Sequence, residues 1–338
     1  MPITDDPYFT LGHLEANESV EGGIATTFAF DGPEGRVDHA FILRPIPGRG
    51  AREDLYDIIS PYGFGGPRLF PAPGADPAAL VAAFGSRFAE FCESRGIVSE
   101  FVRFHPFETQ AELFAGIYDV DLLRPTVYTD LTGEGVFERE FSKTARRRFR
   151  RNARSGVTTR IVEKPRSLEE FKRVYRMTMD RNDANAFYRF EDEYFEALTT
   201  KMSDQVVVAE ARYEGTTIAA ELCLVGAGRI HSHLQGTDSR FRDMSPAYSL
   251  AGAILEWGIE KNMTLIHHGG GLTNSREDPL YLHKRSFGTG EADFYVGRRV
   301  WIPEHYEELC AAHGVDPSDT SFFPAYRRER CPDFQSEA

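Results

Sequence analysis

A lysine beside a glycine-rich segment is the side chain of this sequence best placed for chemistry. Residues 267–288 read HHGGGLTNSREDPLYLHKRSFG, in which Lys284 and Tyr281 follow three consecutive glycines at 269–271. Glycines allow another molecule to approach the backbone closely. A lysine ammonium beside them can stabilise negative charge that develops on an oxygen during group transfer. The alternative interpretation is an ordinary glycine loop followed by a surface lysine.

A second segment has features of an anion-binding site. The sequence RFRDMSPAYSLAGAILEW carries Ser245 and Pro246 at the start of a helix expected over 246–262, directly after a strand. Backbone N–H groups at a helix start attract anions, although a Ser-Pro pair is also a common helix cap. Tyr248 in the first turn and His233 in the preceding strand are candidate substrate contacts. His231 and His233 alternate along that strand, but we expect no metal site there.

The charge of the chain is concentrated in one band. Residues 141–160 contain eight Lys and Arg and no Asp or Glu, whereas the rest holds 31 basic and 52 acidic residues, for a net charge of −13 over the 338 residues. Apolar residues recur every four positions from Phe137 to Ala153, which predicts a helix ending near Gly156. The arginines then form either a solvated helix face or a surface for phosphates. Candidate phosphate contacts are Lys143, Arg147, Arg148 and Arg151.

The loop ISPYGFGGPRLF, at 59–70, is a third candidate. Its prolines and glycines favour a fixed irregular turn, which would hold Tyr62 and Phe64 near the end of a strand. A structural loop and a clamp on a ligand are both compatible with this pattern.

The elements that must position these residues alternate between strands and helices. Two strands are expected within 24–46, a helix over 76–95, and strands near 97–106 and 119–131. The order then starts again with a strand at 157–164, helices at 167–180 and about 191–203, three strands between 205 and 238, the helix at 246–262 and a strand at 264–271. Because both halves share this order, we expect an α/β (α+β) fold of two similar domains. They span 1–134 and 135–310, and a tail over 311–338 packs back on them.

Composition excludes several classes of protein. The length suggests about two domains, and no apolar run reaches the roughly 18 residues that a membrane span needs. The first residues, MPITDDPYFT, have no basic region of a signal peptide. The four cysteines form no CxxC pair, which argues against disulfides and structural zinc. We therefore expect a cytoplasmic enzyme.

Taken in order, these motifs resemble the FemABX family of aminoacyl-tRNA-dependent peptidyltransferases. The loop SPYGFGGP, the basic helix KTARRRFRRNARSGV and the stretch MTMDRNDANAFYRFEDEYFEAL are each similar to a family segment. So are the strand-and-helix segment up to HHGGG and the motif DPLYLHKRSFG, which matches a family pattern ending in Phe-Lys-x-x-Phe. The resemblance covers residues 55–310.

The resemblance implies two GNAT-like domains, with the acceptor beside the first and the aminoacyl end of a tRNA at the second. It makes Lys284 the functional lysine, and His283 stands where the family has phenylalanine. It also implies that Arg181 and Tyr188 contact acceptor phosphates. No cofactor is implied beyond the aminoacyl-tRNA co-substrate, and the acceptor is an amine on a peptidoglycan precursor or a small natural product.

Two other functions compete with this one. An acyl-CoA-dependent GNAT N-acyltransferase would hold a pyrophosphate at the helix start after Ser245, although RFRDMSPA lacks the glycines usual in such loops. A non-catalytic scaffold on the same fold would be insensitive to replacement of Lys284.

Overall fold

The chain forms two compact units in the computed structural model, which describes residues 5–46, 54–181 and 188–330. Unit 1 comprises residues 1–12 and 124–292, and unit 2 comprises 13–123 and 293–338. The sequence analysis instead places boundaries at 134 and 310. The difference arises because strands β6 (Asp119–Asp130) and β12 (Gly290–Val300) each contribute residues to both units.

Unit 1 is built on one sheet in the order β6–β11–β10–β9–β8–β7. Every neighbouring pair is antiparallel except β10 and β11, which are parallel. The other strands of this unit are β7 (Thr158–Glu163), β8 (Val206–Tyr213), β9 (Thr216–Gly226), β10 (Arg229–Thr237) and β11 (Leu265–Gly270).

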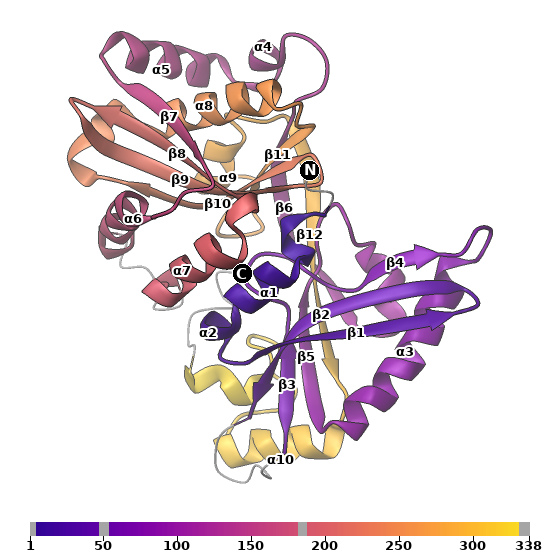
Figure 1. Cartoon of the computed structure of the whole chain (residues 1–338). Helices are drawn as coiled ribbons and strands as arrows, with labels where there is room; N and C mark the ends of the chain where they lie inside the picture. Colours follow the sequence, from indigo (N-terminus) through magenta and orange to yellow (C-terminus); the bar gives the residue numbers. More distant parts are fainter. Residues whose placement is uncertain (1–4, 47–53, 182–187, 331–338) are drawn as a thin grey trace. The chain divides into compact units, whose positions relative to one another are not determined.

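Helices cover both faces of this sheet (Figure 1). Helix α8 packs against β7 and β8 and carries α5 on its outer side, whereas α6 packs against β9 and β10. The helices are α4 (Val136–Glu140), α5 (Lys143–Arg154), α6 (Glu169–Arg181), α7 (Asp192–Lys201), α8 (Ala247–Glu260) and α9 (Pro279–Lys284), with short 3-10 turns at Pro7–Phe9, Ser203–Gln205 and Ser239–Met244.

The strands of unit 2 lie in the order β1–β2–β3–β5–β12, with β4 also paired to β2. Here β3 and β5 form the parallel pair, and the other pairs are antiparallel. Its elements are β1 (Ile24–Gly32), β2 (Gly35–Pro45), β3 (Tyr56–Ile59), β4 (Arg68–Pro71), β5 (Ile97–Arg103), α2 (Glu18–Glu21), α3 (Pro77–Ser94), α10 (Pro303–His313) and 3-10 turns at Ala111–Gly116 and Ala325–Arg330; α1 (Leu11–Ala16) begins at the end of the first segment of unit 1.

The two units repeat one topology. Each unit contains three consecutive antiparallel strands, and a helix follows the third strand. The next strand pairs parallel with that third strand. On its other side it pairs with a further, antiparallel strand. In unit 1 these are β8, β9, β10, α8, β11 and β6; in unit 2 they are β1, β2, β3, α3, β5 and β12. The expected α/β fold of two similar halves is thus confirmed, although no repeat is visible in the residues themselves.

The parallel pair of unit 1 separates early. Strands β10 and β11 are paired only from Arg229 to His231, opposite 265–267, and bulges follow in both strands. In unit 2 the corresponding strands remain bridged further along, because the glycine loop after β3 pairs Gly65 with Phe104. The gap between β10 and β11 therefore opens a site in unit 1.

The basic helix is shorter than the apolar spacing suggests. The chain extends at Phe141, and Ser142 caps α5 by accepting a hydrogen bond from the Ala145 N–H. A capping serine satisfies an N–H that a continuing helix would have bonded, so it separates α4 from α5. The predicted end is correct: Gly156 adopts a positive φ of 84° after the last turn.

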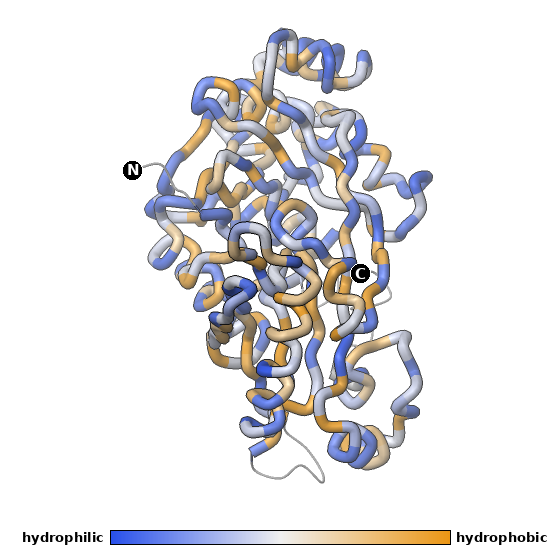
Figure 2. Tube along the Cα trace, turned by 90° about the vertical axis from the view of Figure 1, so that its right-hand side faces the viewer, coloured by the Kyte–Doolittle hydropathy of each residue, from blue (hydrophilic) through white to orange (hydrophobic). Residues whose placement is uncertain are grey.

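Apolar residues form the cores of both units, for instance around Ile254 in unit 1 and around Phe84 and Val98 in unit 2. Phe322, Phe323 and Tyr326 of the tail are buried in unit 2, where the Tyr326 hydroxyl donates to Asp57. Residues 331–338, including Phe334, lie outside the described part. Hydrophobic and hydrophilic residues alternate at short intervals along the trace (Figure 2), and none of the described helices has the length and apolar character to cross a bilayer.

Candidate functional site

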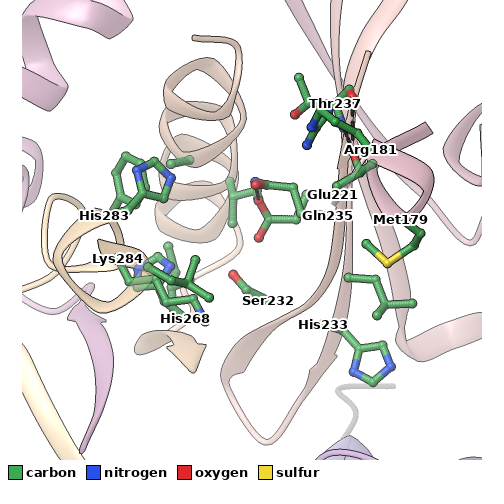
Figure 3. A pocket seen from close by; sticks show the side chains of 17 residues that line it. Met179, Arg181, Glu221, Ser232, His233, Gln235, Thr237, His268, His283 and Lys284 are labelled. Carbon is green, nitrogen blue, oxygen red and sulfur yellow. Dashed lines mark hydrogen bonds between the residues drawn. The ribbon is translucent and has the colours of Figure 1, made fainter. Parts of the chain in front are cut away.

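A cavity of about 400 Å³ lies where β10 and β11 separate. Residues of β9, β10, β11, α6, α8 and α9 line it, all within unit 1. Ala251, Ile254, Ile266 and Phe287 give it an apolar wall. Its polar side chains project from several elements (Figure 3): Glu221, Ser232, Gln235, His268, His283 and Lys284. The mixture of an apolar wall with a few converging polar groups is typical of a small-molecule site.

Lys284 ends α9 and reaches the cavity beside the glycine segment. Its Nζ donates a hydrogen bond to the Gly270 carbonyl at 2.7 Å. Burial lowers the pKa of Lys284 to about 8, with Arg124 acting in the same direction and the carboxylates of Glu221 and Asp278 opposing it. At neutral pH the side chain is a poorly solvated cation, which is suited to stabilising a new negative charge.

The glycines of HHGGG are explained by this contact. Gly269 has a φ of 74°, and a Cβ there would lie 3.2 Å from the lysine Nζ. A Cβ on Gly271 would lie 2.6 Å from Asp278 Oδ1. Larger residues would therefore strain the backbone or displace the lysine and the cap of α9.

Asp278 holds α9 in place. Its Oδ1 accepts from the N–H groups of Leu280 and Tyr281, both at 2.9 Å, and its Oδ2 accepts from the Leu272 N–H at 3.1 Å. This double cap ties the glycine segment to the helix that carries Lys284. Asp278 is thus a positioning residue.

His268 lies beside Lys284 in a fixed orientation. The Thr129 hydroxyl donates to the Phe287 carbonyl at 2.7 Å, so at 2.8 Å from His268 Nε2 it acts as the acceptor. Nε2 therefore carries the proton, and Nδ1 keeps its lone pair. Burial, with Lys284 and His283 nearby, lowers the pKa of His268 to about 3. The ring stays neutral and adds no second positive charge next to the lysine.

A second cavity, of about 730 Å³, adjoins the first and shares Arg181, Thr237, Leu280 and His283 with it. Arg148, Arg181 and Arg242 line it at the start of α8. Burial and the neighbouring Arg242 lower the pKa of Arg181, which also donates to the Thr237 carbonyl at 3.2 Å. Three guanidinium groups at the N-terminus of a 14-residue helix create a strong attraction for anions.

The arginine-lined cavity is held together by contacts between α5 and α8. Asn152 is buried and donates to the Ser245 carbonyl and to Ser249 Oγ, each at 3.1 Å. Arg148 donates to Ser245 Oγ at 3.0 Å, and its Cζ lies 4.9 Å from the Tyr248 ring centroid. The basic helix therefore contributes one arginine to the cavity instead of lying apart from it.

The predicted substrate contacts in unit 1 differ in whether they line both cavities, one cavity or neither. His283 and Arg181 line both cavities, and Tyr248 lines the arginine-lined one and packs edge-on against His283 with centroids 5.5 Å apart. His233 lines the first cavity but bonds Tyr194 through Nε2 at 2.6 Å. Tyr188 is half-buried, and its carbonyl accepts a hydrogen bond from the Tyr175 hydroxyl at 2.7 Å.

The other predicted contacts lie elsewhere. Tyr62 and Phe64 belong to unit 2, where Phe64 packs against His105 and Phe294. Lys143, Arg147 and Arg151 project from α5 and are exposed. Sequence reasoning did not identify Glu221 or His268; a carboxylate inside the apolar strand TTIAAELCLVG is the signal that would have indicated Glu221.

The lowered pKa of Lys284 predicts a pH-dependent gain in stability. The ordinary value is 10.5, so between about pH 8 and 10.5 the unfolded chain binds the proton that the folded chain has released, and stability rises with pH. The shift corresponds to about 3 kcal/mol, which water in the open cavity reduces to about 1–2 kcal/mol. The free energy of unfolding, measured in urea below pH 8 and again near pH 10.5, should show this increment in the wild type and in Lys261→Met, but not in Lys284→Met. Equal increments in all three would contradict it.

Comparisons with known proteins bear on the family and the fold. A model of the acetyltransferase (GNAT) domain matches residues 139–277. The UDP-N-acetylmuramoylpentapeptide-lysine N(6)-alanyltransferase of Weissella viridescens is 25% identical over 171 residues, which span 50% of this chain and 49% of that relative. The match thus covers about half of either protein.

Solved structures share the fold over most of the chain. The crystal structure of FemX superimposes with a TM-score of 0.68 at 11% identity, covering 88% of this chain and 92% of FemX. The structure of L-PGS from Bacillus licheniformis has a TM-score of 0.54 at 16% identity, covering 94% of this chain and all of the other.

Proposed function

Since the chain is a FemABX-like protein with the fold of the tandem GNAT acyltransferases, we propose that it is an aminoacyl-tRNA-dependent aminoacyltransferase. It would move an amino acid from the 3′ end of a tRNA to an amine and form an amide bond. The observation that carries this proposal is the adjacency of two cavities, one containing Lys284 and the other lined by three arginines.

The first cavity supplies what the reaction needs at the ester. The acceptor amine attacks the ester carbonyl carbon directly, so a C–N bond forms, the ester C–O bond breaks, and the ribose oxygen takes up a proton while the amine loses one. Negative charge develops on the carbonyl oxygen and then on the ribose oxygen. Lys284 is present as an ammonium at neutral pH and is partly shielded from water, so it stabilises that charge.

The arginine-lined cavity supplies what the RNA needs. Arg148, Arg181 and Arg242 beside the start of α8 suit the phosphates of a 3′ end whose terminal ester enters the first cavity. This proposal gives Arg181 a different partner from the acceptor phosphates that the sequence analysis assigns to it. The exposed Lys143, Arg147 and Arg151 of α5 would extend this basic surface along the RNA.

The acceptor is proposed to be an amine on a peptidoglycan precursor. The support is the Weissella viridescens relative, which is named as an alanyltransferase to the lysine of UDP-N-acetylmuramoylpentapeptide. Tyr62, Phe64 and Tyr188 are the contacts proposed for the acceptor, and a small amine-bearing natural product is the other acceptor class.

An acyl-CoA donor is the second candidate. The GNAT match and the arginines at the start of a helix would also suit a pyrophosphate. Against it, Ser245 itself adopts a positive φ of 52° and is bonded by Arg148. The turn before α8 therefore lacks the open glycine backbone that such a loop offers to a pyrophosphate.

A donor assay separates these functions. The protein is incubated with an amine acceptor and either a pool of labelled aminoacyl-tRNAs or labelled acyl-CoA. We expect labelled amide from the tRNA pool alone, and RNase treatment should abolish it. Transfer from acyl-CoA that resists RNase would favour the second candidate, and no transfer from either donor would contradict both.

A further inference from the structure

A buried carboxylate in the first cavity takes no part in the chemistry at the ester. Glu221 lies in the middle of β9, is 6% exposed and lines the cavity together with Lys284. Gln235 on β10 donates to its Oε2 at 2.8 Å, and the Cys223 thiol donates a long hydrogen bond of 4.0 Å to its Oε1. These neutral donors orient the carboxylate, and the charge of Lys284 offsets its charge only in part, without a direct ion pair.

Two other buried acids of unit 1 have arginine partners. Glu210, at 5% exposure on the next strand, accepts from Arg160 at 2.8 Å, and Asp238 accepts from Arg240 at 2.7 Å. For Glu221 no Lys, Arg or His nitrogen lies within 4 Å among the described residues of the chain. Burial raises its pKa. A buried carboxylate without an ion-pair partner is costly, so a cation that enters the cavity and contacts it would be strongly stabilised.

Glu221 and Lys284 come from different walls of the cavity. The lysine comes from α9 and the glutamate from β9, with Ser232 between them in the view of Figure 3. A ligand that fits between them needs a group that becomes negative toward the lysine and a positive group toward the glutamate. An aminoacyl ester has both, because its ammonium is attached to the carbon next to the reacting carbonyl.

We infer that Glu221 binds the α-ammonium group of the esterified amino acid and thereby selects aminoacyl over simple acyl donors. This inference rests on the proposed function, whose donor it describes more closely. Acyl groups of acyl-CoA carry no such cation, so they would leave the carboxylate buried and unpaired. The apolar wall of Ala251, Ile254 and Phe287 remains for the side chain of the amino acid.

Binding of paired ligands tests the inference. The ligands are two 3′-amide analogues of aminoacyl-adenosine, one with a free amine and one N-acetylated, carrying the amino acid that the donor assay identifies. Calorimetry should show that the wild type prefers the free amine by roughly ten- to a hundredfold, as expected for a hydrogen bond between charged groups. Glu221→Gln should lose that preference and leave the affinity for the N-acetyl form unchanged.

Glu210→Gln is the matched control, because it removes a carboxylate of similar burial from the neighbouring strand outside the cavity. It should keep the preference. If Glu221→Gln does not fold, Glu221→Asp, which withdraws the carboxylate by one methylene, should weaken the free-amine analogue alone.

The outcomes distinguish this inference from the proposed function. A wild type that binds both analogues equally, or a Glu221→Gln variant that weakens both equally, would overturn the role of Glu221 and leave aminoacyl transfer standing; the second result would make Glu221 a counter-ion of Lys284. A wild type that shows neither RNase-sensitive transfer nor analogue binding would overturn the proposed function, and this inference with it.

Discussion

Replacement of Lys284 by methionine is expected to lower kcat for aminoacyl transfer by about two to three orders of magnitude, the usual cost of removing a single donor to a developing oxyanion. Methionine keeps the length and apolar stem of the side chain but carries no charge. The loss should fall on kcat more than on KM, because the lysine contributes mainly after charge has developed on the ester oxygen.

The pH profile separates this role from simple packing. With a lysine pKa of about 8, the cation is lost as pH rises, so kcat/KM should have a descending limb near pH 8. Lys284→Arg should remove that limb, since guanidinium remains charged. Lys261→Met, at an exposed ion pair with Glu163, is the control and should retain the wild-type profile. Near-normal kcat in Lys284→Met would contradict the assignment and favour a scaffold.

Local signals in the sequence predicted the helices around the site closely. The helix expected over 246–262 is observed at Ala247–Glu260. It begins directly after Pro246, where the helix start depends on neighbouring residues alone. The role of Lys284 could also be predicted, because the glycines and the motif around the lysine are close together in the sequence.

The partners of Lys284 were set by pairing between distant strands. Thr129, which orients His268, lies 139 residues away in the chain. Glu221 meets the cavity only because β10 separates from β11 after three paired residues. Neither the bulges that separate these strands nor the assignment of β6 and β12 to both units has a local signal in the sequence, since register depends on the whole sheet.

The acidic net charge of −13 can be reconciled with an RNA substrate only if the contact is local, which gives the second large prediction. Arg148, Arg181 and Arg242 surround one cavity at the start of α8, so they act on the same few phosphates. Reversal of all three to glutamate should weaken tRNA binding by at least about a hundredfold. It should also flatten the dependence of log K on log salt by about 2, because each single-stranded phosphate contact contributes about 0.7.

The control is a triple reversal of exposed basic residues that line neither cavity, Arg87, Lys164 and Lys261, which changes the net charge of the protein by the same amount. If binding depends on overall charge, both triple variants should lose the same affinity and the same slope. If it depends on the cavity, the control should keep the wild-type slope, because charges on a surface are screened beyond about 10 Å at 0.1 M salt. Filter binding of a labelled aminoacyl-tRNA over a series of salt concentrations measures both quantities. Equal slopes in the two variants would contradict a local phosphate site, and with it the route by which the ester reaches Lys284.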